Sequence, residues 1–483
     1  MHDSLTWGAH LWTLGRTPER ALPVAEALQF AQDANAELLY VLPVSSGWGE
    51  CTGKAGFFAK CAPGLSEREC AKREIIRVLD MLIGNPQYAA IRRFQLGNEP
   101  WSHPEYAQFA YEIAQIIKQR DPTLQVGIVG YPSTGDNQGG NPDKTAYDQA
   151  LLPQLTKTCN GVPCFDFVTD HLYARQGYRD MANQNFHSTL DATEIERLVT
   201  SDFRGRVAYW PGNVPQMVRD RRSEYGLPVA VTEWNTTCWP GRSDIPYWFT
   251  TEQGLHTAGM LASMAKGDAA ASHYHLLGPT AVNLEGQACA VVYGDHTPTA
   301  MGQAIRFMSG LRGLQLVDAK VQSPRRPLNE SRVSCAANNA PDKDMTCTNH
   351  GQCSSGYCDK GKCDGCSDWT ATACSAPYCT GNPVPDYLDV TAGYQASTNS
   401  YVVYIIHRGE RPLRLDLRWG PLAEGGLGTP RRRVLSASSY ADRVFNARSA
   451  TTVANLSNVL VEPRGVTEIV VPRTSSSPPM LVE

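Results

Sequence analysis

Two kinds of hydrophobic pattern alternate over residues 1–312. Short runs that are apolar at nearly every position are typical of strands buried on both faces of a parallel sheet. We predict six such strands, at residues 37–44, 92–97, 125–130, 165–173, 228–234 and 270–277. Between them, apolar residues recur three and four positions apart, as in helices that pack one face on a sheet.

The alternation of strands and helices predicts an α/β fold of the (β/α)8 TIM barrel type. Six strands are too few to close that barrel, and the segment before residue 37 offers only a helix at 21–35 and an ambiguous run at 5–14. We therefore expect a barrel that lacks its first one or two strands, because the chain starts after the true beginning of its gene product. An open sheet of six strands is the alternative.

The pattern changes after residue 312. Residues 401–407 and 466–471 are β-type apolar runs, and apolar and polar residues alternate over 413–419, as in a half-buried strand. These runs predict an antiparallel β-sandwich formed by residues 313–334 and 380–483. Residues 335–379 are too poor in apolar residues to fold without cross-links, so we expect a Cys-rich insert there.

Fifteen cysteines stand out in a composition that is otherwise globular, with 42% hydrophobic and 19% charged residues. Eight of them fall between Cys335 and Cys379. Such clustering favours disulfide bonds, so we expect a secreted or extracellular protein whose signal peptide is not in this chain. A zinc site is the alternative, but Cys363 and Cys366 have no second ligand pair at the usual distance.

The net charge of −4 is small for 483 residues and gives no reason to expect nucleic acid or an anionic membrane as a partner. No apolar run reaches the length of about 18 residues that a membrane span needs. The sequence also has no phosphate-binding glycine motif, no dinucleotide fingerprint and no metal-ligand constellation. We therefore expect neither a cofactor nor a metal, and the oligomeric state is left open.

Two carboxylates follow predicted strands. Glu99 comes directly after the strand at 92–97, and Glu233 lies at the end of the strand at 228–234. Catalytic groups of a (β/α)8 barrel lie at the C-terminal ends of its strands, so we expect both side chains in one pocket. Cleavage of a glycosidic bond requires two carboxylates that face each other across the sugar. The pattern therefore predicts a glycoside hydrolase.

Both glutamates lie in motifs that resemble those of a known group of enzymes. Residues 97–101 (GNEPW) resemble the acid/base motif of the clan A glycoside hydrolases, and residues 232–235 (TEWN) resemble their nucleophile motif. The similarity spans about residues 20–312 and is greatest to family 51, which is α-L-arabinofuranosidase-like. The resemblance implies a retaining hydrolase with Glu99 as the general acid/base and Glu233 as the nucleophile. Residues 347–363 also resemble an EGF-like module, which fits an extracellular glycoprotein.

The resemblance extends to the surroundings of the two glutamates. Asn98 resembles the clan's asparagine that binds the sugar 2-hydroxyl. His171 and Tyr173 point the same way at the end of the strand at 165–173, where similar enzymes orient the nucleophile. Trp101 and Trp234 are candidates for stacking on sugar faces, because flat apolar rings match the C–H faces of sugars. Each of these residues also has an ordinary structural alternative, in a turn or in the core.

Two other functions remain open at this point. A heparanase-like β-glucuronidase shares the Gly-Asn-Glu string, although basic subsite residues for a uronic acid are not evident. A catalytically inactive secreted protein that binds carbohydrate, or acts in adhesion through the Cys-rich insert, is the second. For an active enzyme we expect a polysaccharide or oligosaccharide substrate, with arabinofuranosidase-like or endoglucanase-like action. The sequence does not indicate which sugar or linkage is cleaved.

Overall fold

The computed structural model describes residues 24–34, 36–42, 44, 66–101, 105–132, 144–173, 202–235, 250–274, 290–292, 297–319, 321, 358–359, 362–363, 388–409, 411–420, 422 and 426–475. These residues form two compact units. The first holds the described residues up to Leu172, together with Arg219–Glu233 and Ala269–His273, and the second holds the rest. Each unit is described by itself.

A six-stranded sheet forms the centre of the first unit. Its order follows the chain: β1 (Leu39–Leu42), β2 (Arg93–Leu96), β3 (Gln125–Val129), β6 (Phe167–Tyr173), β7 (Val229–Asn235) and β8 (Ala271–Tyr274). The pairings of β1 with β2, β2 with β3 and β3 with β6 are parallel. All six predicted strands are therefore present, and the order is that of a TIM-type barrel wall. Residues 1–23 lie outside the described part, so the loss of the first strands stays a prediction.

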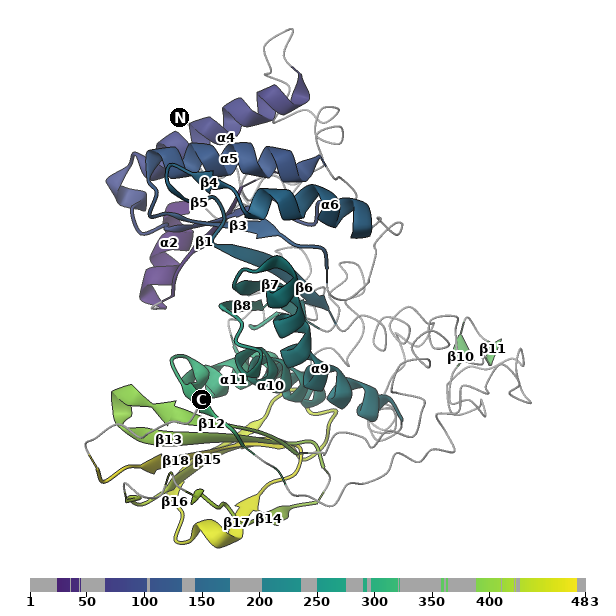
Figure 1. The fold of residues 1–483 in the computed structure, drawn as a ribbon. Helices are drawn as coiled ribbons and strands as arrows, with labels where there is room; N and C mark the ends of the chain where they lie inside the picture. The colour runs from purple at the N-terminus through teal and green to yellow at the C-terminus, as the bar shows by residue number, and fades with distance from the viewer. Residues whose placement is uncertain are drawn as a thin grey trace. The chain divides into compact units, whose positions relative to one another are not determined.

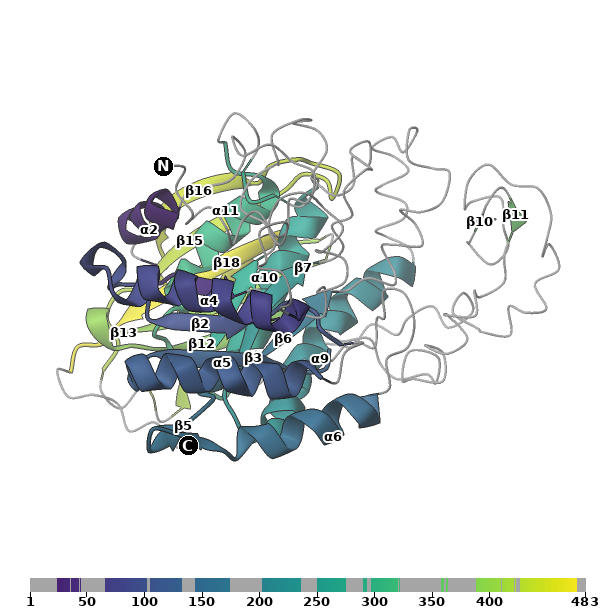
Figure 2. The same cartoon turned by 90° about the horizontal axis from the view of Figure 1, so that it is seen from above.

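Helices accompany this sheet as the alternating pattern predicts. They are α2 (Val24–Asp33), α4 (Glu67–Ile83), α5 (Tyr106–Arg120), α6 (Lys144–Leu155) and α9 (Asp202–Tyr225). Figure 1 shows α4, α5 and α6 over the part of the sheet that contains β3, and Figure 2 shows α4 and α5 running alongside β2 and β3. The buried side chains of α5 include Phe109, Ile113 and Ile117, which lie three or four positions apart on one face.

A short hairpin precedes β6. Its strands β4 (Thr158–Cys159) and β5 (Val162–Pro163) are joined by Asn160 and Gly161, both with positive φ (52° and 80°), as the tight Asn-Gly hairpin turn requires. A disulfide bond between Cys159 and Cys164 closes the hairpin. It is the one disulfide among the residues that the structure describes.

An antiparallel sheet dominates the second unit. Its order is β16 (Asn446–Thr452), β15 (Arg431–Ser436), β18 (Gly465–Pro472), β13 (Ser400–His407), β12 (Leu388–Gln395) and β9 (Gln315–Val317), and β14 (Leu413–Leu415) pairs separately with β17 (Val459–Val461). The predicted antiparallel sandwich is therefore confirmed. The alternating run at 413–419 is strand only over its first three residues.

The central strand β13 is buried at every position because both of its faces are covered. Val402, Tyr404 and Ile406 share a core with helices α10 (Thr251–Lys266) and α11 (Ala300–Phe307). The alternate residues Val403 and Ile405 face a second core that contains residues of β17. The two-residue period of a strand thus divides one apolar run between two cores.

The remaining short elements are 3-10 turns and one small ribbon: η3 (Pro86–Tyr88), η5 (Met308–Leu311), η9 (Ala396–Thr398), η11 (Leu456–Asn458), and the pair β10 (Cys358–Asp359) and β11 (Lys362–Cys363). Cys358 lies opposite Cys363 in that ribbon. The rest of the predicted Cys-rich insert, residues 335–379, lies outside the described residues. Its EGF-like character stays a prediction.

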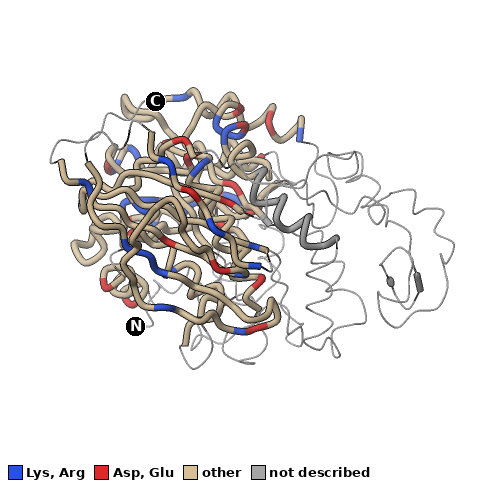
Figure 3. Tube along the Cα trace, turned by 90° about the horizontal axis from the view of Figure 1, so that it is seen from below, with Lys and Arg blue, Asp and Glu red and all other residues tan. Residues whose placement is uncertain are grey.

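Basic and acidic segments are interspersed on the face drawn in Figure 3, rather than gathered by sign. Over the described residues, no helix has both the length and the apolar composition to cross a membrane.

A buried ion pair next to β6 generates a prediction about stability. Lys118 is 2% exposed, and its Nζ donates to Asp166 Oδ2 at 2.8 Å and to the Leu124 carbonyl oxygen at 2.7 Å. Lys118→Met removes both bonds and leaves a carboxylate and a carbonyl short of a donor. We expect the free energy of unfolding to fall by about 2 kcal/mol. Urea denaturation followed by circular dichroism measures this loss.

Lys72→Met is the matched control, because Lys72 makes a half-exposed ion pair with Glu112 at 3.3 Å. Exposed pairs contribute little, so we expect a loss of about 0.5 kcal/mol or less. Equal losses in the two variants would contradict the structural role of Lys118.

Candidate active site

A glycine turn ends β2 and determines where Glu99 lies. Gly97 has a φ of +83°, and a Cβ atom at this position would lie 1.9 Å from the carbonyl oxygen of Val44. Its N–H donates to the Leu42 carbonyl oxygen at 2.8 Å, which ties the turn to β1. Only glycine combines this backbone conformation with so close an approach. The first residue of the GNEPW motif is therefore fixed by backbone sterics.

Glu99 itself adopts a left-handed backbone conformation, with a φ of 49°. A non-glycine residue pays about 1–2 kcal/mol for this conformation, so the surrounding structure must hold it. Gln95 Nε2 donates to the Gly97 carbonyl oxygen at 2.9 Å. The buried hydroxyl of Tyr106 donates to the Leu96 carbonyl oxygen and accepts from Val129 N at 2.9 Å, which joins the ends of β2 and β3. The turn that carries Glu99 is thus held on both sides.

Glu233 is positioned by a regular strand. The residues of β7 are buried from Val229 to Asn235 with the one exception of Glu233, whose side chain is 22% exposed. The apolar residues before it fix the strand in the sheet, and the carboxylate is the group that reaches the open side.

His171 lies on β6, the strand next to β7. Its side chain is 1% exposed, and its backbone N–H donates to Asp170 Oδ1 at 2.9 Å. The ring of Trp101 packs edge-on against the imidazole, with 5.8 Å between the ring centroids. The imidazole is therefore held by packing as well as by hydrogen bonds.

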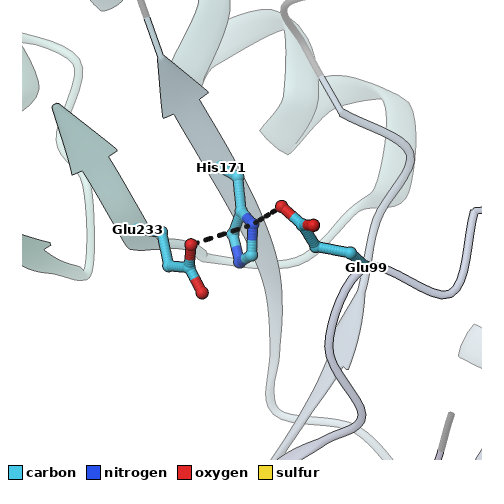
Figure 4. Close-up of side chains that lie close together, drawn as sticks. All are labelled: Glu99, His171 and Glu233. Carbon is cyan, nitrogen blue, oxygen red and sulfur yellow. Dashed lines mark hydrogen bonds and ion pairs between the residues drawn. The ribbon is translucent and has the colours of Figure 1, made fainter. Parts of the chain in front are cut away.

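The three side chains converge at one point, as Figure 4 shows. His171 Nδ1 lies 2.9 Å from Glu99 Oε1 and 3.7 Å from Glu233 Oε2. A carboxylate oxygen of each glutamate and a ring nitrogen of His171 all lie within 4.8 Å of one another. Glu99 and Glu233 therefore lie close together, with His171 between them.

The electrostatics of the cluster depend on the two acids. Burial lowers the pKa of His171, but the carboxylates of Glu233, Glu99 and Asp170 outweigh burial and raise it above its ordinary value. Because the pKa is higher in the folded state, the protonated imidazole stabilises the fold fully below the ordinary pKa of histidine. That contribution is lost as the pH rises through the raised pKa.

Two kinds of contact suit the geometry of this cluster, a metal ion and a direct hydrogen bond. Its donor set, two carboxylates and an imidazole, is one that divalent cations also use. The 2.9 Å between His171 Nδ1 and Glu99 Oε1, however, is the length of a direct N–H···O bond. This distance fits a direct hydrogen bond between His171 and Glu99.

The other predicted site residues differ in what the structure describes. Asn98 Nδ2 is buried without a hydrogen-bond partner among the described residues, so its amide has a free donor next to Glu99. Trp101 is 8% exposed, and its Nε1 donates to the Gly130 carbonyl oxygen at 3.0 Å. Trp234 is 1% exposed and packs edge-on against Tyr274. Tyr173 is the last residue of β6, and the position of its side chain is not described.

These positions bear on the proposed sugar contacts. Both tryptophans pack against protein, which is the structural alternative that the sequence left open, so stacking on sugar stays a prediction for Trp101 and Trp234. The same holds for sugar binding by Asn98 and Tyr173.

Sequence reasoning gave no role to two charged residues near the cluster. Asp170 precedes His171 and is 2% exposed, and Arg221 of α9 lies with its Nε 3.7 Å from Asp170 Oδ2. Asp170 could have been found from its place in the strand next to His171. Arg221 lies in a stretch of charged residues that reads as an exposed helix face, and nothing in it points to β6.

The position of His171 generates a prediction about its titration. Glu99→Gln removes one of the carboxylates that raise the pKa of the imidazole, so we expect that pKa to fall. NMR titration of ¹⁵N-labelled histidine side chains measures the change. Glu112→Gln, on the outer helix α5, serves as the control and should leave the titration unchanged. A pKa of His171 that stays constant in Glu99→Gln would mean that the two groups do not interact in solution.

Solved structures with a similar fold are glycoside hydrolases. The α-L-arabinofuranosidase of Thermotoga maritima in complex with arabinose has a TM-score of 0.50 at 15% identity, over 93% of this chain and 78% of that one. A family 51 α-L-arabinofuranosidase from Bifidobacterium longum has a TM-score of 0.51 at 11% identity, over 93% and 79%. A family 44 xyloglucanase from Paenibacillus polymyxa has a TM-score of 0.50 at 13% identity, over 95% and 86%.

No family model matches the chain, and no curated protein matches it in sequence. The structural similarity covers nearly the whole chain and includes both the parallel sheet and the antiparallel sheet. The predicted resemblance to family 51 is thereby confirmed at the level of the fold: the chain has the barrel-and-sandwich fold of family 51 α-L-arabinofuranosidases and related glycoside hydrolases.

Proposed function

We propose that this protein is a retaining glycoside hydrolase, with Glu99 as the general acid/base and Glu233 as the nucleophile. One observation carries the proposal: oxygens of the two carboxylates lie within 4.8 Å of each other. Retaining enzymes hold their carboxyl groups about 5–5.5 Å apart, whereas inverting enzymes need about 6.5–9.5 Å to admit a water molecule. The separation favours direct attack by one carboxylate on the sugar.

In the first step, the ionised Glu233 attacks the anomeric carbon, and the bond from that carbon to the leaving oxygen breaks. Glu99 transfers its proton to the leaving oxygen, so the departing group leaves as a neutral alcohol. The products of this step are a glycosyl ester on Glu233 and an ionised Glu99. In the second step, Glu99 takes a proton from water while the water oxygen attacks the anomeric carbon, which frees Glu233 as a carboxylate.

His171 fits both steps as the group that balances charge. Its Nδ1–H donates to Glu99 while that residue is ionised, and the same nitrogen lies 3.7 Å from Glu233. One negative charge passes from Glu233 to Glu99 when the ester forms, and an imidazole between them interacts with either carboxylate. No rearrangement of the backbone is needed for this exchange.

The proposed substrate is a polysaccharide or oligosaccharide, and an α-L-arabinofuranoside is the first candidate. Two of the similar structures are α-L-arabinofuranosidases and the third is a xyloglucanase. The similar structures give no support to a uronic acid substrate, since they are arabinofuranosidases and a xyloglucanase. Nothing favours an inactive adhesion protein either, because both glutamates converge. We also keep the proposal of an extracellular location, which rests on the cysteine content alone.

The acid role of Glu99 predicts how its removal depends on the leaving group. In Glu99→Gln, we expect kcat/KM to fall on the order of 10²–10⁴-fold for alkyl glycosides, whose poor leaving groups need a proton. For activated aryl arabinosides such as the 2,4-dinitrophenyl compound, the first step should be nearly unaffected. Steady-state and burst kinetics on the purified variant measure both values. Equal losses on the two substrate classes would contradict the acid assignment.

The nucleophile role of Glu233 predicts covalent labelling. A panel of mechanism-based reagents, 2-fluoroglycosides and cyclophellitol-type epoxides of arabinose, glucose, xylose and glucuronic acid configuration, should give one ester on the peptide that contains Glu233. The sugar that labels identifies the substrate class. Glu233→Gln should not label, and the control Glu112→Gln should label fully. Labelling at a different carboxylate, or labelling of Glu233→Gln, would contradict the assignment of Glu233 as the nucleophile.

A further inference from the structure

A buried polar network lies behind β6, on the side away from the two glutamates. Asp170 and His171 are consecutive strand residues, so their side chains point to opposite faces of the sheet. Both are 2% exposed. The imidazole reaches the carboxylates of Glu99 and Glu233, whereas Asp170 faces α9.

Asp170 connects the two sides. One carboxylate oxygen, Oδ1, accepts the backbone N–H of His171 at 2.9 Å. The other, Oδ2, lies 3.7 Å from Arg221 Nε. A carboxylate that is 2% exposed is costly unless a cation compensates it, and Arg221, which is 6% exposed, supplies that charge.

Arg221 is in turn held by neighbours on α9. Its Nη1 donates to Glu224 Oε2 at 2.5 Å and to the Tyr225 hydroxyl at 3.3 Å, and its guanidinium lies 5.3 Å from the Tyr225 ring. The Tyr225 hydroxyl donates to Asp148 Oδ1 at 2.8 Å and accepts from Tyr131 N at 3.0 Å. The network therefore joins α6, α9 and the chain after β3 to the strand that carries His171.

We propose that Asp170 and Arg221 are positioning residues for the catalytic cluster. Asp170, paired with Arg221, holds the backbone of His171 by accepting its N–H. The opposite charges of the pair set the charge of the imidazole, which keeps it between Glu99 and Glu233. The inference rests on the proposed glycosidase function, which it deepens. Neither residue touches the reacting atoms, so both act through His171.

Four described charges from four segments surround the imidazole. They are Glu99 from the turn after β2, Glu233 from β7, Asp170 from its own strand and, behind Asp170, Arg221 from α9. Loss of the Arg221 charge removes a positive charge from behind Asp170, which favours the protonated imidazole. Loss of the Asp170 charge removes a negative charge next to His171, which favours the neutral imidazole.

The test uses Arg221→Gln, Asp170→Asn and the double variant in the full chain. The Asn side chain keeps an oxygen that can accept the His171 N–H. We expect the ¹⁵N titration of the His171 imidazole to move to higher pH in Arg221→Gln and to lower pH in Asp170→Asn. In the double variant, which is neutral on both sides, the titration should return toward that of the original protein. His171→Asn assigns the signal.

Activity supplies the second readout. Misplacement of a reacting group costs up to about 10²-fold in rate, so we expect each single variant to lose on the order of 10–100-fold in kcat with a small change in KM. The limb of the pH–rate profile that reports His171 should move with the NMR titration. The double variant should recover part of kcat.

Lys118→Met is the matched control, because it breaks an ion pair at the other end of the same strand, where Asp166 precedes β6. We expect it to lower the free energy of unfolding and to leave the pH at which His171 titrates unchanged. Circular dichroism confirms that each variant is folded. If one single variant does not fold, the other single variant and the double variant still differ by one charge at the pair, so the direction of the titration shift can still be tested.

The outcomes separate this inference from the proposed function. If the His171 titration shifts in opposite directions in the two single variants but the protein cleaves no glycoside, the positioning role is supported and the glycosidase function is ruled out. Active variants whose His171 titration stays constant, or moves the same way in both, would overturn the positioning role and retain the glycosidase. Loss of activity in proportion to loss of folded protein, with an unchanged pH profile, would also overturn it.

Discussion

The close approach of two carboxyl groups is the constraint on which the described site depends. Oxygens of Glu99 and Glu233 lie within 4.8 Å of each other, and two unit charges at that separation would repel by about 3–4 kcal/mol at an effective dielectric constant of 20 if both groups were ionised. A rigid backbone must hold the two side chains in place, and a positively charged or hydrogen-bonding group must offset their repulsion. The turn at Gly97 and the regular strand β7 provide the rigid backbone, and the imidazole of His171 interacts with the carboxylates.

Buried hydroxyl groups hold the ends of the strands in place around this cluster. Tyr106 joins the end of β2 to the end of β3, and Tyr225 joins the chain after β3 to α6. Burial raises the pKa of both phenols, so each stays a neutral donor and acceptor at any ordinary pH. Glu99 can therefore keep its left-handed backbone conformation, and the two carboxyl groups can lie close together, because the backbone beneath them is held by hydroxyl groups that stay neutral.

Much of the fold and part of the site follow from the sequence. Continuous apolar runs identified all six strands of the parallel sheet, and a carboxylate at the end of two runs identified Glu99 and Glu233. The left-handed conformation of Glu99 could not be read from Asn-Glu-Pro, because it depends on the approach of Val44 to Gly97. The partnership of Asp170 with Arg221 could not be read either, since helix α9 contains two prolines and several charges that resemble a solvent-exposed segment. Local patterns reveal strands, whereas contacts between distant charges need the folded chain.

Strand β6 shows why such contacts matter. The two-residue period that makes a strand visible in a sequence also lets adjacent residues meet opposite surroundings. In β6 an imidazole faces two carboxylates on one side, and a carboxylate faces a guanidinium on the other. On each face of β6, opposite charges therefore meet: His171 faces the two glutamates, and Asp170 faces Arg221. In the proposed role of Asp170 and Arg221, a change of charge on the face toward α9 shifts the titration of His171 on the face toward the two glutamates, because one peptide unit of β6 separates the two side chains.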